Sequence, residues 1–312
     1  MDTITHSLSG WALGQAGLKS QTRKGLAALI LGANMPDIDV FFGWVPWVPL
    51  ATHRGFTHGV GGLLVMPPLL AGLLWLLDRW QMNRGAAFKS GLSMRPGWLL
   101  ALCYLSGVSH PSLDLLTTYS VQLLSPFSSA WYHADGLFII DVWLWLLFAG
   151  TISWSKWREK RGSEWRRPVQ AALAIALAYI AVNLLISQSA YAAVRDWAGN
   201  RPVEAMFASP PPFYSWRREL VWRERGCYRR SQFDPLAGFG SVGECQPTGL
   251  DQPQLQSAIA RDPRLQKFLR WSILPQAEVE RGRCTARVTI GDARYGEGRR
   301  SRLGRESVIR TC

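Results

Sequence analysis

Histidine and cysteine are scarce in this sequence, and both are unevenly placed. Only five histidines occur in 312 residues, and none lies beyond His133. Of the five cysteines, Cys103 alone precedes Cys227. A thiolate zinc site needs several cysteines close together, so such a site is excluded from the chain before Cys227. A metal site in that part of the chain must use imidazole and carboxylate ligands.

Acidic residues are outnumbered, 22 against 35 lysines and arginines, which gives a formal net charge of +13. The basic excess is mostly arginine, which suits anionic headgroups or phosphates. It does not by itself indicate nucleic-acid binding, because the sequence contains no zinc finger, no RNA-recognition signature and no P-loop. A cleavable signal peptide is not expected, since the start MDTITHSLSG is polar and acidic rather than basic and then apolar.

Charge is sparse in four long apolar segments, 59–77, 97–116, 136–154 and 169–187. As a helix, each is long enough to cross about 30 Å of hydrocarbon. The 16 tryptophans favour a bilayer environment, because Trp concentrates at membrane interfaces. Two weaker segments, 4–18 and 25–34, predict short helices around the basic turn KSQTRK, which dip into the membrane or pack against the bundle.

Lysine and arginine gather in three connections and are nearly absent from the alternate ones. The basic connections contain Lys19, Arg23 and Lys24, then Arg79, Arg84, Lys89 and Arg95, then Lys156, Arg158, Lys160, Arg161, Arg166 and Arg167. The positive-inside rule places these connections in the cytoplasm. Alternation then places the chain after residue 187 outside a bacterial inner membrane.

The C-terminal region 189–312 predicts a basic extracytoplasmic α+β domain that follows a membrane-embedded helical domain, 1–188. ELVWRERGCYRR and RCTARVTIGDARY alternate like strands, and QPQLQSAIARDPRLQKFLRW is typical of one amphipathic helix. Four cysteines here fit an oxidising compartment. Proximity favours the pairs Cys227–Cys245 and Cys284–Cys312, with four unpaired thiols as the alternative. The expected fold is mainly α, a polytopic transmembrane helical bundle with this domain attached.

All five histidines fall on the outer side of this topology, together with several aspartates. On that side lie Asp2, His6, Asn34, Asp37, Asp39, His53, His58, His110, Asp114, His133, Asp135 and Asp141. Asp2 with His6 and His110 with Asp114 are four residues apart, so each pair projects from one helix face. Because imidazole and carboxylate bind zinc and similar divalent ions, the pattern predicts a site for one or two ions.

Taken singly, each candidate also has a structural interpretation. Asp2 fits helix capping, Asp37 and Asp39 fit a proline turn, and Arg54 fits an interfacial anchor. His110 fits a helix start, His133 a surface position, and Asp141 a buried hydrogen bond. The metal site is favoured because all of these residues share one side and one depth, where ionisable groups are costly.

Five motifs occur in order along residues 2–141: DTITHSLSG, PDID, HRGFTH, SHPSLD and the IID of FIID. In these motifs the chain resembles the YdjM-like family of predicted membrane-bound, metal-dependent hydrolases. That family is distantly similar to the zinc-dependent phospholipase C and S1/P1 nuclease group, whose helical folds hold zinc ions with His and Asp. The metal ligands that the resemblance implies are His6, Asp37, Asp39, His53, His58, His110 and Asp114.

The resemblance also implies roles for the remaining candidates. Asp2 and Asp141 would be further ligands or would orient the imidazoles, and Arg54 would face a phosphate. An uncoordinated Asp37 or Asp39 would accept a proton from water. The soluble zinc phospholipases use their N-terminal amine as a ligand; here the chain begins Met-Asp, so that role would be lost or pass to Asp2.

The expected function is therefore zinc-dependent hydrolysis of a phosphoester in a lipid or lipid-linked substrate, at the outer face of the inner membrane. The alternative is a non-catalytic membrane protein, either a transporter or ion pathway or a structural protein whose basic tail binds a partner. A pathway would spread ionisable groups through the membrane, whereas 59–77 and 169–187 contain no charged residue.

Overall fold

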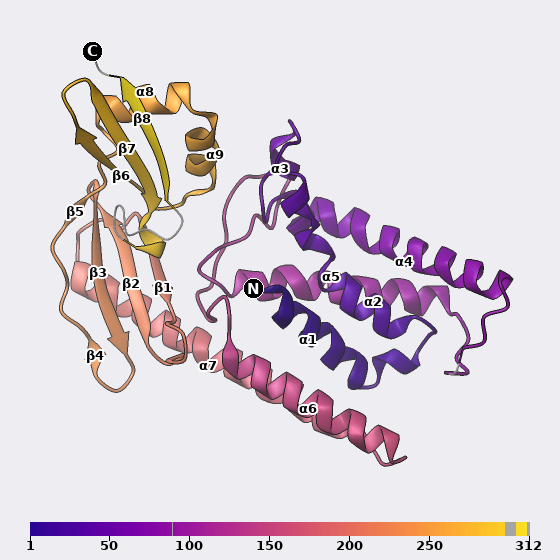
Figure 1. The fold of residues 1–312 in the computed structure, drawn as a ribbon. Coiled ribbons are helices and arrows are strands. Elements are labelled where there is room, and N and C mark those ends of the chain that lie inside the picture. Colours follow the sequence, from indigo (N-terminus) through magenta and orange to yellow (C-terminus); the bar gives the residue numbers. More distant parts are fainter. Residues whose placement is uncertain (89, 297–303, 311–312) are drawn as a thin grey trace. The chain divides into compact units, whose positions relative to one another are not determined.

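A computed structural model describes residues 1–88, 90–296 and 304–310 of the chain. The chain divides into two compact units (Figure 1). Unit 1 comprises Met1–Leu184 with Pro212–Ser215, and unit 2 comprises Leu185–Pro211 with Trp216–Cys312. Each unit is described by itself.

Unit 1 is helical. Its elements are α1 (Thr3–Gln15), η1 (Leu18–Ser20), α2 (Gly25–Gly32), η2 (Met35–Phe41), α3 (Val48–Ala51), η3 (Phe56–His58), α4 (Val60–Asn83), α5 (Pro96–Leu115), α6 (Val142–Lys160) and the first part of α7 (Arg166–Ala198). Helix α2 packs against α1 and α5, α5 packs against α4, and α1 packs against α6. The short helices expected at 4–18 and 25–34 correspond to α1 and α2.

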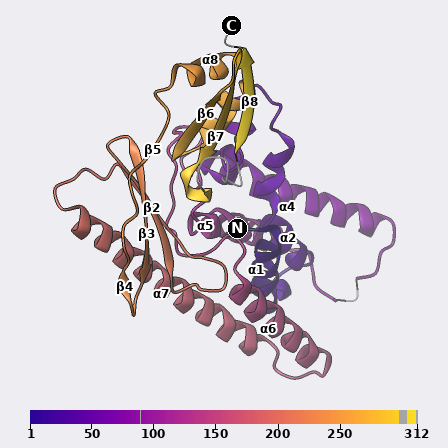
Figure 2. The same cartoon turned by 60° about the vertical axis from the view of Figure 1, so that its left-hand side comes forward.

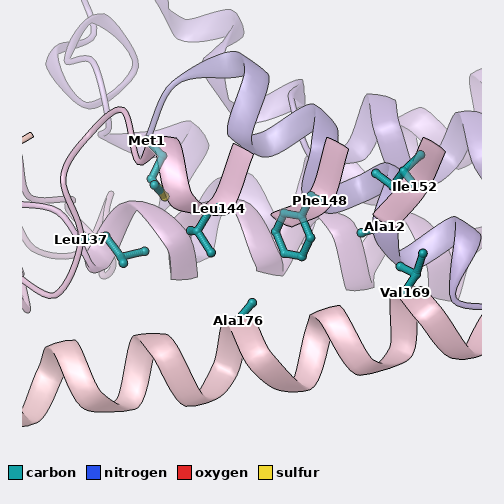
Figure 3. Packing of buried hydrophobic residues seen from close by; sticks show 8 residues of the cluster. All are labelled: Met1, Ala12, Leu137, Leu144, Phe148, Ile152, Val169 and Ala176. Atoms are coloured by element: carbon teal, nitrogen blue, oxygen red, sulfur yellow. The ribbon is translucent and has the colours of Figure 1, made fainter. Parts of the chain in front are cut away.

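Two apolar cores hold these helices together. In the first core, Leu144, Phe148 and Ile152 recur every four residues along α6 and pack with Val169 and Ala176 of α7 (Figure 3). The second core joins α2, α4 and α5 through Ala28, Leu29, Leu70, Ala71, Leu74, Leu99, Leu102 and Cys103. The second core positions α5, whose last turns carry His110 and Asp114 of the candidate site.

Among the described helices, α4 and α7 are long and apolar enough to cross a membrane. Their mean hydropathy is 2.1 and 2.2, and only 39% and 22% of their most apolar windows are buried. The acidic residue within α4, Asp78, is buried and pairs with Arg23 at 2.7 Å. The two helices therefore support membrane association by length and composition.

The other two expected spans are only partly supported. Helix α5 covers 97–116 almost completely, but it does not reach the apolarity of α4 and α7. The segment 136–154 was placed too early, because residues 136–141 precede α6. Asp141 is the N-cap of that helix rather than a residue within it, and its carboxylate accepts the N–H groups of Trp143 and Leu144 at 3.1 Å.

Unit 2 contains two antiparallel sheets. The first has the order β1 (Ala205–Ser209), β2 (Arg218–Glu224), β3 (Cys227–Asp234), β4 (Gly238–Phe239), with β5 (Gln246–Pro247) also paired to β3. The end of α7 lies beside this sheet (Figures 1 and 2), where Tyr191 and Val194 pack in one core with Trp222. The second sheet has the order β6 (Pro275–Arg281), β7 (Thr285–Asp292), β8 (Arg305–Arg310).

Two helices cover the second sheet, α8 (Pro253–Arg261) and α9 (Pro263–Trp271). A single helix was expected here, and this was wrong because Asp262 ends the first helix and caps the second, accepting the N–H of Arg264 at 2.9 Å. Cys227 and Cys245 form a disulfide, as expected, with their Cα atoms 5.5 Å apart. The second expected pair includes Cys312, which lies outside the described residues.

Candidate metal centre

Four side chains from three separate segments converge at one end of unit 1. They are Asp37 of η2, His58 of η3, and His110 and Asp114 of α5. His58 Nε2 lies 3.2 Å from Asp114 Oδ2 and 3.4 Å from Asp37 Oδ1. His110 Nε2 lies 3.3 Å and 3.4 Å from the same two oxygens, and 3.0 Å from His58 Nε2. We call these four residues the cage.

The protons of the two imidazoles point away from the cage. His110 Nδ1 lies 2.6 Å from the carbonyl oxygen of Ala33, which can only accept, so Nδ1 carries the proton. His58 Nδ1 lies 3.2 Å from Asp39 Oδ2, which likewise places a proton on Nδ1. Both Nε2 atoms then present lone pairs to each other and to two carboxylate oxygens. Such a cluster of electron-rich atoms is suited to hold a cation.

The spacing of the cage atoms fits a small divalent ion. Ligands about 2.0–2.1 Å from a tetrahedral zinc ion lie roughly 3.3 Å from one another. The five measured separations between the cage atoms run from 3.0 to 3.4 Å. The donor set of two imidazoles and two carboxylates is also one that zinc accepts, so the residues present fit a metal.

His6 of α1 lies against the cage. Its ring stacks on that of His110 with the centroids 3.7 Å apart, and its Nε2 is 3.4 Å from Asp114 Oδ1. The ring is fully buried, yet neither nitrogen has a hydrogen-bond partner among the described residues. A buried imidazole is usually satisfied, so these two free nitrogens indicate a missing ligand or proton partner.

A second group of possible ligands shares Asp37 with the cage. It consists of Asp37, Asp39 and His53. His53 is about one-third exposed and Asp37 about one-quarter, whereas the other three cage residues are buried. Asp37 and His53 therefore form the open side of the centre.

Asp39 is a buried hydrogen-bond acceptor that holds the loop carrying the histidines. Its carboxylate accepts from the backbone N–H of Arg54 and from Thr57 Oγ1, both at 2.9 Å. It also lies 2.7 Å from His53 Nδ1 and 3.2 Å from His58 Nδ1. A carboxylate on Nδ1 fixes the tautomer that leaves Nε2 free for a metal.

Both carboxylates of the PDID motif stay ionised. Burial alone would raise the pKa of Asp37, but when acid protonates His110 and His58, their Nε2–H groups and positive charge outweigh burial and hold the pKa far below its ordinary value. The same balance applies to Asp39, where the contacts with His53 and His58 lower the pKa. The centre therefore keeps its negative charge through the neutral pH range.

Arg54, which the family resemblance places toward a phosphate, has a side chain that is buried beside the cage. The guanidinium donates to Thr117 Oγ1 at 3.1 Å, pairs with Asp114 Oδ1 at 3.0 Å and lies 4.4 Å from the centre of the Tyr119 ring. The Met1 amine pairs with the same Asp114 oxygen. The Arg54 guanidinium offsets part of the charge that two carboxylates bring to the cage, whereas burial and this guanidinium lower the pKa of the Met1 amine well below its ordinary value.

The remaining candidates lie outside both groups of possible ligands. Asp2 caps α1 by accepting from the N–H groups of Ile4 and Thr5 at 2.9 and 3.1 Å. Asp141 caps α6 and accepts from the hydroxyl of Tyr179 at 2.9 Å. His133 and Asp135 pair with each other at 3.0 Å. The two capping aspartates thus have the structural role that their sequence positions also allowed.

The sequence pattern did not indicate several supporting groups. Thr57, the carbonyl of Ala33 and the Met1 amine all contact cage residues or their partners. The sequence does carry one sign that the chain is closely packed around His58, because Gly59, Gly61 and Gly62 of GVGG follow this histidine directly. A Cβ on Gly62 would lie 2.3 Å from the carbonyl oxygen of Thr57, so glycine lets the histidine loop sit on the first turn of α4.

The fold and this site define a class: a membrane-associated helical protein with a cluster of His and Asp suited to a metal ion. The sequence profile of the YdjM inner membrane protein family matches residues 1–190, and the chain belongs to that family. It is also similar to the uncharacterized protein YfhP of Bacillus subtilis (strain 168), with 28% identity over 140 residues. The match covers 42% of this chain and 39% of that relative. No solved structure matches the chain significantly.

Proposed function

We propose that the protein is a metal-dependent hydrolase that cleaves a phosphoester in a lipid or lipid-linked substrate at the outer face of the inner membrane. The observation that carries the proposal is the cage, in which two imidazole lone pairs and two carboxylate oxygens face one another at 3.0–3.4 Å. Membership of an inner membrane protein family and the two apolar helices support the membrane location.

The proposed ligands are the cage residues with His6, and the group of Asp37, Asp39 and His53 offers a second position. A divalent ion held by these nitrogen and oxygen donors would act, when bound, as a Lewis acid toward water and a phosphoryl oxygen. Zinc is the ion that this donor set favours.

The chain's own residues divide the remaining work. Asp39 holds the His53 and His58 rings, and both of its oxygens are occupied in doing so. Asp37 is partly exposed and faces the cage through Oδ1, so its other oxygen, Oδ2, remains to accept a proton from water. Arg54 offsets the charge on Asp114 and keeps that carboxylate oriented.

The distribution of charge along the chain supports a substrate at the membrane. All the cage residues lie at the ends of segments whose opposite connections are rich in Lys and Arg, which we assign to the cytoplasm. The centre and unit 2 are then extracytoplasmic. The bilayer is the proposed partner, and a phospholipid or lipid-linked phosphoester the proposed substrate.

The test is elemental analysis of the detergent-purified protein, together with hydrolysis of bis-p-nitrophenyl phosphate. We expect about one or two equivalents of a divalent metal and measurable hydrolysis in the wild type. The His58→Ala/His110→Ala double variant should lose both. His133→Ala is the matched control, because this histidine lies outside the cage. A metal-free wild type contradicts the proposal, and a metal-loaded wild type that hydrolyses no phosphoester favours the non-catalytic alternative.

A further inference from the structure

An uncharged segment joins the two ligand-bearing parts of the centre. Residues 40–52 read VFFGWVPWVPLAT, between Asp39 and His53, and contain no charged side chain. Their large apolar side chains are exposed: Phe41 by 72% and Trp44 by 79%, with Val40, Trp47 and Val48 at about half. Exposed aromatic and aliphatic groups at this density are unusual for a surface that faces water.

A second loop adds to this surface. Leu124 is 45% exposed and Phe127 is 82% exposed. The loop is fixed on the start of α4, because the N–H of Val60 donates to the carbonyl of Leu123 at 2.9 Å. We define the apolar rim as Val40, Phe41, Trp44, Trp47, Val48, Leu124 and Phe127.

The rim continues the exposed apolar side of α4. Trp47 packs against Phe56 with the ring centroids 5.0 Å apart, and Phe56 in turn contacts Gly61 in the first turn of α4. From there, exposed apolar side chains run down the helix at Leu64, Val65, Leu69, Leu73 and Leu76. Figure 1 shows α3 at the N-terminal end of α4. The rim thus adjoins the exposed apolar side of α4, a candidate span.

We infer that the apolar rim inserts into the interfacial layer of the outer leaflet, so that a lipid headgroup reaches the open, Asp37 and His53 side of the centre from within the bilayer. The occupant is a lipid surface because Trp and Phe are enriched at the level of headgroups. The loop is uncharged and lies beside an apolar span, so it offers no opposite charge to a charged partner. The part of the inference that concerns substrate delivery rests on the proposed function; the lipid contact of the rim does not.

Spin labelling tests the lipid contact directly. Nitroxide labels are placed on Trp44→Cys and Phe127→Cys in lipid nanodiscs, with Ser163→Cys in the basic α6–α7 connection as the exposed control. We expect collisions with oxygen to exceed those with a water-soluble nickel chelate at both rim positions, and the reverse at position 163. Labels at 44 and 127 that collide mainly with the nickel chelate overturn the inference. So do labels shielded from both agents, because these would show that unit 2 or a second copy of the chain covers the rim.

Substrate delivery is tested with the triple variant Phe41→Ser/Trp44→Ser/Phe127→Ser. We expect hydrolysis of a phospholipid in phosphatidylglycerol and phosphatidylethanolamine vesicles to fall by about tenfold or more, with bis-p-nitrophenyl phosphate hydrolysis and bound metal unchanged. The exposed Leu236→Ser in unit 2 is the control. Equal loss on both substrates contradicts delivery through the rim. If the wild type hydrolyses neither substrate, the proposed function fails, and the spin labels still decide the lipid contact.

Discussion

Asp39 shows how a carboxylate can matter to a metal site by fixing the ligands. It contacts the Nδ1 atoms of His53 and His58 and the backbone of Arg54, whose φ of 62° is rarely adopted by a residue with a side chain. The hydrogen bond to Asp39 helps to hold that backbone. The orientation of the whole HRGFTH loop therefore depends on this one side chain.

Asp39→Asn keeps the shape of the residue but removes its charge and part of its accepting capacity. We expect metal affinity to fall by about 10–100-fold, because the Nδ1 protons of the two imidazoles lose their carboxylate partner. Competition with a chromophoric chelator measures this. Asp196→Asn, at an exposed position on α7, is the matched control and should bind as the wild type does. Unchanged affinity in Asp39→Asn would show that Asp39 does not orient the ligands.

At the scale of residues, the sequence predicted which residue types come together, but not which of them face the cage and which orient the histidines. The spacing of His110 and Asp114 places both on one face of α5, and both face the cage. Asp37 and Asp39 sit two apart in one motif, yet one faces the cage and the other faces the Nδ1 side of its histidines. That division arises from the path of η2, a 3₁₀ helix whose course the side-chain pattern does not specify.

At the scale of elements, the start of α4 depends on glycine. Gly62→Ala should lower the free energy of unfolding in detergent by about 1–3 kcal/mol, because the new Cβ meets backbone atoms of Phe56 and Thr57. Gly72 lies in the same helix, and a Cβ added there would meet nothing within 4 Å among the described residues. Gly72→Ala should therefore leave stability unchanged or raise it by up to about 1 kcal/mol. Equal stability of the two variants in chemical denaturation would contradict the close approach.

The helices of unit 1 were predictable where apolar runs are long, and their ends were not. Helix α5 and the core of α6 fall where hydrophobic segments predicted them. The start of α6 was missed because residues 136–140 are apolar but lie outside the helix, and only the cap at Asp141 marks the boundary. In unit 2, Asp262 and Pro263 separate α8 from α9. The amphipathic pattern continues on both sides of them, so the pattern alone predicts a single helix.

For the whole molecule, a bound metal joins segments that are distant in the sequence. Chelation with EDTA at neutral pH should lower the thermal unfolding midpoint by several degrees, because an ion bound only to the folded state stabilises it. Differential scanning fluorimetry measures the shift, and re-addition of zinc should reverse it. The His58→Ala/His110→Ala variant is the control and should not respond to the chelator.

Metal binding should also weaken as the pH falls. Histidines must be neutral to bind a metal, and burial together with the charge of neighbouring His110 lowers the pKa of His6 well below the ordinary imidazole value of about 6.5, so affinity should decline only below about pH 6.5. The lowered pKa of Asp37 and of Asp39 means that these carboxylates remain ionised in that range and do not cause the decline. Calorimetric titration at several pH values tests this. An affinity that does not change between about pH 7 and pH 4 would contradict histidine ligation.

The disulfide Cys227–Cys245 has a consequence for locating unit 2 in a living cell. Such a bond forms where the surroundings are oxidising and is kept open where glutathione and thioredoxin act. The two sulfurs therefore record the compartment in which this unit folded. A thiol-reactive tag applied to intact, unreduced material would skip them in exported chains and mark them in chains left in the cytosol.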